Sequence, residues 1–490
     1  MIYDSFRETC RRNATADALV DGEVRVSFEE LSANVDALAA TLAARWAPKA
    51  GDWVVLHLWN SREYVAAFFA LMRLGTVAVL LNPRLKANEL RNALVDLPIR
   101  GVVTSRELAA VWPEVCGENG PPTLAVDELP TADMDSRSAL AALPPQSVSG
   151  GQAAIILCTS GTTGLPRRVV RSHHSLLANA GNVATNLDMA GGAKILSVIP
   201  FAHANGFSNC LLAPLLHGTT LCLMRRFDPV EVGKLVERED IGFVLGSPFI
   251  FSQLLSVGRK AFARVKIALS SGAPLPAEIK HRCQQELGLE VRQLYGSSET
   301  GTIAIQSEQD GAVDGCLGQP LTGVELAILD AYDRPLLTGE TGEIAVRSPA
   351  MMSGYWEKTG PSRAGFRNGF FGMGDLGCLD ELGRLHLRGR TKRMINVGGV
   401  KLDPEEIAQV IRLLPDVVDC LVHGAPHAIQ TELVAATIWL RPGAKLSRGE
   451  LTQHCRSFLA ENKLPRLVVM TDEARELPAM KALAVAKERP

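Results

Sequence analysis

A stretch rich in glycine and hydroxyl side chains follows directly on an apolar run, residues 153–157. It consists of Thr159, Ser160, Gly161, Thr162, Thr163 and Gly164, and it ends at Leu165-Pro166. Glycines let backbone N–H groups converge on an anion, and the hydroxyls add further donors. A Walker A loop ends in Gly-Lys followed by Ser or Thr, so this is not the loop of a P-loop NTPase. Alone, the stretch fits an ordinary surface turn or a phosphate-binding loop of another class.

The sequence around this loop resembles a family signature. Residues 159–176, which continue as Arg167-Arg168-Val169-Val170-Arg171-Ser172-His173-His174-Ser175-Leu176, are similar to the signature of the adenylate-forming ligases. This superfamily contains acyl- and aryl-CoA synthetases, peptide-synthetase adenylation domains and luciferases. The resemblance runs from Asp52 and Asn60 to Leu477-Pro478. It implies that ATP activates a carboxylic acid to an acyl-AMP, that pyrophosphate leaves, and that the acyl group passes to a second nucleophile.

Further segments match elements of the same family, and the resemblance implies a role for each. Residues 200–206 match Pro-x-x-His-x-x-Gly, which places His203 beside an acyl pocket. Residues 295–301 imply that Tyr295 stacks on adenine, Ser298 donates to the α-phosphate and Glu299 holds Mg²⁺. Asp375 accepts hydrogen bonds from the ribose hydroxyls, and Arg390 also reaches the ribose. The remaining implied residues are Arg167 and the loop at the phosphates, Gly272, Ala273, Pro274 and Gly296 at the adenine, and Ala202, Ala204, Asn205 and Gly206 in the acyl pocket.

The chain departs from the family pattern in two places. The loop continues Pro166-Arg167-Arg168 where the family has Pro-Lys-Gly; arginine keeps the charge, but a side chain at position 168 is unfavourable if the backbone there needs a positive φ. Ala484 stands at the position of the catalytic lysine, and such a loss costs on the order of 3 kcal/mol of transition-state stabilisation. Three explanations stay open: an engineered replacement, substitution by Lys481 or Lys487, or an inactive adenylate-binding homologue.

The departures favour a specialised branch of the family. We expect an enzyme similar to the amide bond synthetases of secondary metabolism, which transfer the acyl group to an amine and release AMP. An aryl- or acyl-CoA ligase that uses the CoA thiol is the alternative. The small residues around the predicted pocket indicate an aromatic or heteroaromatic acid, although tight packing uses the same residues.

The elements that position these residues indicate an α/β protein. Apolar spacing predicts a helix over residues 28–46, and buried strands alternate with helical segments from Trp53 to Ser270. Such alternation is typical of wound, mainly parallel sheets. A small β unit begins near Gly315. We therefore expect a large N-terminal domain, residues 1–390, a hinge at residues 391–392 with Lys392 as its pivot, and a mobile α+β C-terminal domain, residues 393–490.

Bulk composition excludes several classes. The 490 residues have a formal net charge of -2, which argues against nucleic-acid binding. The longest apolar stretch, residues 65–81, is interrupted by Arg73 and Gly75, so no membrane span is expected. The polar first thirteen residues lack the apolar region of a signal peptide, which predicts a cytoplasmic protein. Ten scattered cysteines without Cys-x-x-Cys spacing predict reduced thiols.

Overall fold

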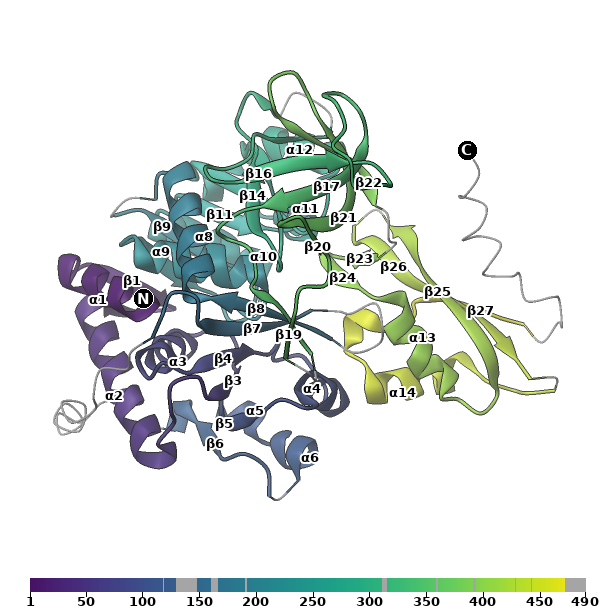
Figure 1. Cartoon of the computed structure of the whole chain (residues 1–490), viewed down its shortest axis with the longest axis horizontal. Coiled ribbons are helices and arrows are strands. Elements are labelled where there is room, and N and C mark those ends of the chain that lie inside the picture. The colour runs from purple at the N-terminus through teal and green to yellow at the C-terminus, as the bar shows by residue number, and fades with distance from the viewer. Residues whose placement is uncertain are drawn as a thin grey trace.

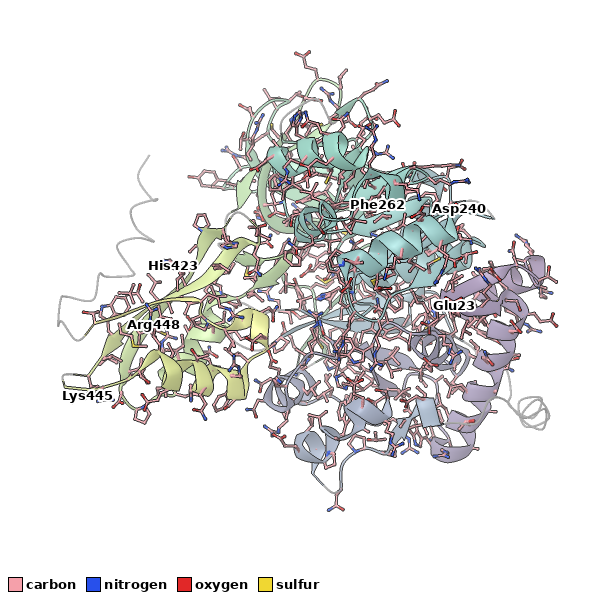
Figure 2. All side chains as sticks on the ribbon, turned by 180° about the vertical axis from the view of Figure 1, so that it is seen from behind. Glu23, Asp240, Phe262, His423, Lys445 and Arg448 are labelled. Atoms are coloured by element: carbon pink, nitrogen blue, oxygen red, sulfur yellow. The ribbon has the colours of Figure 1, made fainter. Side chains whose placement is uncertain are left out.

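The computed structural model describes residues 1–117, 119–128, 148–159, 166–189, 192–310, 315–357, 360–390, 394–427, 429–441 and 443–471. Three sheets and most helices form a large N-terminal unit, and a smaller unit follows Arg390 (Figure 1). Figure 2 shows both units from behind, with Glu23, Asp240 and Phe262 on the larger and His423, Lys445 and Arg448 on the smaller. The predicted fold class, a large α/β domain followed by a small α+β domain, is confirmed.

Two sheets of eight strands each form the centre of the N-terminal unit. In each sheet the inner strands are parallel and the strands toward one or both edges are antiparallel. The first sheet has the order β14 (Gly301–Ile305), β13 (Val291–Ser297), β12 (Ile267–Ser270), β11 (Phe243–Gly246), β9 (Lys194–Ser197), β10 (Thr220–Leu223), β1 (Asp17–Asp21) and β2 (Val24–Ser27). The second has the order β19 (Gly360–Ser362), β18 (Gly354–Glu357), β8 (Arg167–Ser172), β7 (Ala153–Thr159), β4 (Val77–Leu80), β3 (Trp53–His57), β5 (Ile99–Thr104) and β6 (Thr123–Ala125).

The helices cover these sheets and fill the space between them. The largest apolar core combines residues of α3 and α8 with inward-facing residues of both sheets. The helix α2 begins at a capping box, in which the Ser27 hydroxyl accepts from Glu30 N and the Glu30 carboxylate accepts from Ser27 N. The N-terminal helices are α1 (Ile2–Arg12), α2 (Phe28–Trp46), α3 (Arg62–Arg73), α4 (Ala87–Leu94), α5 (Arg106–Ala109), α6 (Trp112–Cys116), α8 (His173–Asn186), α9 (Ala213–Leu216), α10 (Pro229–Glu239), α11 (Pro248–Leu254) and α12 (Ala277–Arg282).

A third, antiparallel sheet completes the N-terminal unit. Its order is β15 (Cys316–Gly318), β22 (Leu385–Arg390), β21 (Phe370–Leu379), β17 (Gly342–Arg347) and β16 (Glu325–Leu329), with β20 (Phe366–Arg367) beside β21. The C-terminal unit has a core of its own. Its sheet contains β24 (Val400–Leu402), β23 (Ile395–Val397), β26 (Thr431–Leu440), β25 (Val417–His427) and β27 (Leu467–Thr471), with the helices α13 (Pro404–Arg412) and α14 (Arg448–Phe458).

Several local expectations are confirmed by these elements. The helix over residues 28–46 is α2, and the apolar stretch from residue 65 is a buried helix, α3, followed by a buried strand, β4. None of the helices in the described ranges is both long and apolar enough to span a membrane. All ten cysteines are free thiols, eight of them buried. The domain boundaries stay a prediction, because Lys392 lies outside the described residues.

Candidate active site

The predicted phosphate-binding loop joins two paired strands. The antiparallel strands β7 and β8 place Thr159 opposite Arg167, and the Thr159 hydroxyl donates to the Arg167 carbonyl at 3.4 Å. The loop therefore begins and ends at one point of the second sheet. Its central residues, Ser160, Gly161, Thr162, Thr163 and Gly164, lie outside the described part of the chain, so their role stays a prediction.

A tyrosine that the sequence did not single out connects this loop to the predicted magnesium residue. Tyr355 on β18 donates a hydrogen bond to Glu299 Oε1 at 2.9 Å. Arg167 donates to the same phenol oxygen at 3.3 Å, and its guanidinium carbon lies 5.1 Å from the ring centroid. Burial first, and then the neighbouring carboxylate, raises the pKa of Tyr355 well above its usual range, so the phenol stays a donor. Arg167, Tyr355 and Glu299 thus form one connected group.

A second arginine, Arg171, binds the backbone of the turn that carries Glu299. Its side chain is fully buried and donates to the carbonyls of Ser298 at 3.2 Å and Ala350 at 2.7 Å. Burial lowers the pKa of Arg171 to about 10, while Glu299 opposes that shift. Arg171 lies inside the family signature, but sequence alone gave no sign that it would hold Ser298 in place.

The predicted adenine and ribose residues are joined by a direct contact. The Tyr295 hydroxyl, at the end of β13, donates to Asp375 Oδ2 on β21 at 2.7 Å, and both residues are buried. Asp375 also lies opposite Arg390 in the register of β21 and β22. The three predicted positions are therefore neighbours. Glu299 lies four residues after Tyr295, in the turn between β13 and β14.

The glycines of the predicted pocket have a second reason to be glycine. A Cβ at position 206 would lie 2.3 Å from the Pro200 carbonyl oxygen, and one at position 296 would lie 2.2 Å from the Gly301 carbonyl oxygen. Both positions therefore require glycine for backbone packing, whatever the size of the acyl group. Glycine at these two positions therefore does not indicate a bulky acid.

The histidine predicted beside the acyl pocket contacts an asparagine. His203 Nε2 lies 3.3 Å from Asn82 Nδ2, and burial, with a further effect of Arg84, lowers the pKa of this histidine. The imidazole is therefore neutral at pH 7. Asn205, two residues on, donates to the Ser271 hydroxyl and accepts from Asn209 at 2.7 Å. Ala202 is buried and Ala204 half-buried in the same segment, which precedes a π-helix, Gly206–Leu212.

The position at which Arg168 replaces glycine needs no positive φ. Arg168 lies in the extended strand β8 and is absent from the residues with positive φ. Its buried guanidinium donates to the carbonyls of Ala93 at 3.1 Å, Asn92 at 3.4 Å and Val95 at 2.6 Å. These carbonyls lie at the C-terminal end of α4, where the last carbonyls of a helix have no amide partner within the helix. The condition of a positive φ is therefore not met at position 168, and the arginine side chain caps a helix of the same domain.

A hairpin of the C-terminal unit lies against the predicted adenine segment. Gly398 and Gly399 connect β23 to β24, and the Ser247 hydroxyl donates to the Gly398 carbonyl at 3.1 Å. Gly272 and Gly399 approach so closely that a Cβ on Gly272 would lie 3.0 Å from the Gly399 oxygen. Ala273 and Pro274 follow Gly272 directly in the chain. Ala484 and Lys392 lie outside the described residues, and their roles stay predictions.

Comparison with known proteins supports a single family. The model of the AMP-binding enzyme family matches residues 6–356, and that of its C-terminal domain matches residues 406–481. Feruloyl-CoA synthase of Amycolatopsis is 30% identical over 94% of this chain and 93% of its own length. Long-chain-fatty-acid–CoA ligase FadD13 of Mycobacterium tuberculosis is 28% identical over 94% and 92%.

Solved structures agree along almost the whole chain. o-Succinylbenzoate CoA synthetase of Bacillus subtilis, as a double mutant bound to its product analogue OSB-NCoA, superposes with a TM-score of 0.85 at 27% identity, covering 96% of this chain and 95% of the other. The same enzyme in complex with AMP gives 0.71 over 96% and 94%. The amide bond synthetase McbA of Marinactinospora thermotolerans gives 0.86 at 24% identity over 97% of both chains, a likeness of fold.

Proposed function

The chain belongs to the AMP-binding enzyme family, and from this premise we propose that it converts an aromatic or heteroaromatic acid to its acyl-AMP and transfers the acyl group to a nucleophile. Members of the family use ATP and yield AMP. In the first step a carboxylate oxygen attacks the α-phosphorus, an O–P bond forms, and the bond to pyrophosphate breaks. In the second step the nucleophile attacks the carbonyl carbon, and AMP leaves.

The observation that carries the first step is the connected group Arg167, Tyr355 and Glu299 together with the pair Tyr295 and Asp375. The group joins a cation, Arg167, to a carboxylate, Glu299, through Tyr355, and the pair supplies a second carboxylate, Asp375, that can accept from ribose hydroxyls. In this proposal Arg167 binds the departing pyrophosphate, Asp375 accepts hydrogen bonds from the ribose hydroxyls, and Ser298 donates a hydrogen bond to the α-phosphate.

Glu299 fits a magnesium ion. Its Oε1 accepts from Tyr355, and no described residue donates to its Oε2. A single carboxylate suits Mg²⁺, which keeps several waters and binds substrate phosphates. When bound, the ion would neutralise charge on the phosphates. Tyr355 would hold the carboxylate in one orientation before the ion binds.

We propose the thiol of CoA as the acceptor, because the curated relatives FadD13 and feruloyl-CoA synthase are CoA ligases. The chain superposes better on the relative bound to a CoA product analogue than on the same relative bound to AMP, with TM-scores of 0.85 and 0.71, and equally well on McbA, so the arrangement of the two units fits acyl transfer without distinguishing the acceptors. The Gly398–Gly399 hairpin then lies where a slender nucleophile would pass. The amine acceptor expected from the sequence stays a prediction, because the likeness to McbA is one of fold.

A cationic surface near His203 also favours CoA. Two guanidinium carbons lie near the centroid of the Trp59 ring, that of Arg226 at 4.6 Å and that of Arg84 at 6.0 Å, and Arg226 also pairs with Glu107. Arg84 follows Asn82, whose side chain contacts His203. Arginines beside an aromatic ring suit the phosphates and adenine of a nucleotide. An amine substrate needs no such surface.

One assay tests both steps. We expect the purified chain, given ATP, Mg²⁺ and an aryl acid, to release pyrophosphate, and to give a thioester with CoA or an amide with an aryl amine, identified by mass. Activity with long-chain fatty acids alone would overturn the proposed acid class. A product formed only with the amine would replace CoA as the acceptor.

The missing lysine is tested in the same assay. Restoring a cation with Ala484→Lys should raise acid-dependent ATP–pyrophosphate exchange by about a hundredfold if position 484 supplies it. If Lys481, at which the match to the C-terminal domain model ends, supplies the cation instead, Lys481→Ala abolishes exchange and Ala484→Lys has no effect. Exchange absent from every variant would indicate an inactive adenylate-binding protein.

A further inference from the structure

A buried lysine joins the two units of the chain at a distance from the nucleotide residues. Lys463 follows α14 in the C-terminal unit, and its ammonium donates to Glu406 Oε1 on α13 at 2.7 Å and to Glu89 Oε1 on α4 at 2.6 Å. Glu406 belongs to the same unit as Lys463, whereas Glu89 belongs to the N-terminal unit. We call Lys463, Glu406 and Glu89 the interdomain cluster.

The cluster is shielded from water. The exposed fractions of the three side chains are 13% for Lys463, 16% for Glu406 and 5% for Glu89. Burial alone would lower the pKa of Lys463, but the two carboxylates raise it, so the lysine is charged. Charge-assisted contacts at such distances are strong when desolvated.

The packing beside the cluster is open. A gap of about 230 Å³ lies between α4 and α13, with Asn88, Asn92, Gln409 and Leu413 among the residues that line it. Apolar packing therefore does not seal this boundary, and the ion pair of Lys463 with Glu89 crosses it beside the gap.

The cluster does not tie the units together permanently. If the C-terminal unit turns away, Lys463 keeps its contact to Glu406, and Glu89 is exposed to water on α4. Neither arrangement then leaves a buried charge without a partner, which is the usual reason why breaking a buried ion pair is costly. A contact of this kind favours one arrangement without forbidding another.

The arrangement that the cluster favours is the one in which the Gly398–Gly399 hairpin lies against Ser247 and Gly272. It also superposes better on the relative bound to a CoA product analogue. The helix α4 is itself anchored, because Arg168 of β8 caps its last carbonyls. Glu89 is thus held at a fixed position relative to the strand that follows the phosphate-binding loop.

We propose that Glu89 and Lys463 are positioning residues for acyl transfer: they hold the C-terminal unit in the arrangement that admits the nucleophile, and adenylation does not need their contact. The proposal rests on the proposed two-step function. It predicts that removing the contact separates the two half-reactions, whereas a residue that only stabilises the fold would affect both alike.

The test compares Glu89→Gln with the unchanged chain, using benzoyl-AMP as the probe for both half-reactions. Pyrophosphorolysis to ATP reports the first step in reverse, and thiolysis by CoA reports the second. We expect thiolysis to fall about tenfold, which corresponds to about 1.4 kcal/mol, while pyrophosphorolysis stays within about twofold. Glu461→Gln is the matched control, because that exposed carboxylate pairs only with arginines of its own unit, and it should change neither rate.

Hydrogen exchange provides a readout that needs no activity. In Glu89→Gln the amides of residues 87–94 and 461–463 should exchange faster, and those of the β7–β8 hairpin should not. If exchange is unchanged, or if both rates fall together, the proposal is wrong. If the unchanged chain processes benzoyl-AMP in neither direction but the exchange pattern changes as expected, the proposed function has failed and the interdomain cluster has not.

Discussion

The hairpin contact between the two units gives a direct test through Gly399. A Cβ at this position would lie 2.7 Å from Ser247 Cβ and 3.1 Å from its oxygen, across the boundary between the units. Overpacking of this kind costs about 1–3 kcal/mol. Since the clash exists only while the hairpin lies on Ser247, we expect Gly399→Ala to slow acyl transfer by about five- to hundredfold. Adenylation should not change.

Backbone strain must be separated from this clash. Gly399 has φ +92°, a conformation that costs an alanine about 1–2 kcal/mol wherever the domains lie. Gly258 has φ +93° and nothing within 4 Å of its added Cβ, so Gly258→Ala carries the strain without the clash. Both variants should lose similar thermal stability. Acyl transfer is measured by single-turnover thiolysis of the acyl-AMP, and equal transfer rates in the two variants would refute the reasoning.

Two single contacts and one buried histidine lead to further predictions. Tyr355→Phe removes the donor to Glu299 and should weaken Mg·ATP binding, measured by calorimetry, by about tenfold. The reason is that a hydrogen bond to a charged group contributes about 1.5–3 kcal/mol. Unchanged binding would show that Tyr355 does not support Glu299 in binding the metal. Arg168→Met removes the donor to the carbonyls of Asn92, Ala93 and Val95, and it should lower Tm by about 2–4 °C or more. An unchanged Tm would show that α4 needs no cap. Burial lowers the pKa of His57 to about 4, so the unfolded chain binds a proton that the folded chain does not between pH 6.5 and 4. Stability is then complete above pH 6.5 and falls below it, by up to about 3 kcal/mol for this group, and His57→Phe should flatten the Tm-against-pH curve there.

The elements of the fold could be predicted because local patterns decide them. The 3.6-residue spacing of Leu31, Val35 and Leu38 gave α2, and the parallel inner strands are continuous apolar runs. Which strands become neighbours depends on contacts between distant segments. The pairing of β8 with β18, which brings Tyr355 to Glu299, has no signal in either segment.

The residues of the candidate site could be predicted from the sequence, whereas most of their contacts could not. Tyr295, Asp375 and Glu299 are recognised through the family signature, and the structure joins Tyr295 to Asp375 and Glu299 to Tyr355. Arg171 and Arg168 lie in that signature too, yet their partners are backbone carbonyls, and any residue type can supply a carbonyl. The glycines at positions 206 and 296 were read as room for substrate, because sequence does not show which backbone approaches them.

The ten free cysteines have a consequence for a protein that makes reactive acyl groups. Acyl-AMP is an electrophile, and the attacking form of cysteine is the thiolate. Cys158, directly before the phosphate-binding loop, has its pKa raised to about 12 by burial, and the same cause raises the pKa of Cys10, Cys210 and Cys222 to about 12. Such thiols are almost entirely protonated at neutral pH. Burial therefore makes these four thiols poor nucleophiles toward an acyl-AMP and protects them from acylation.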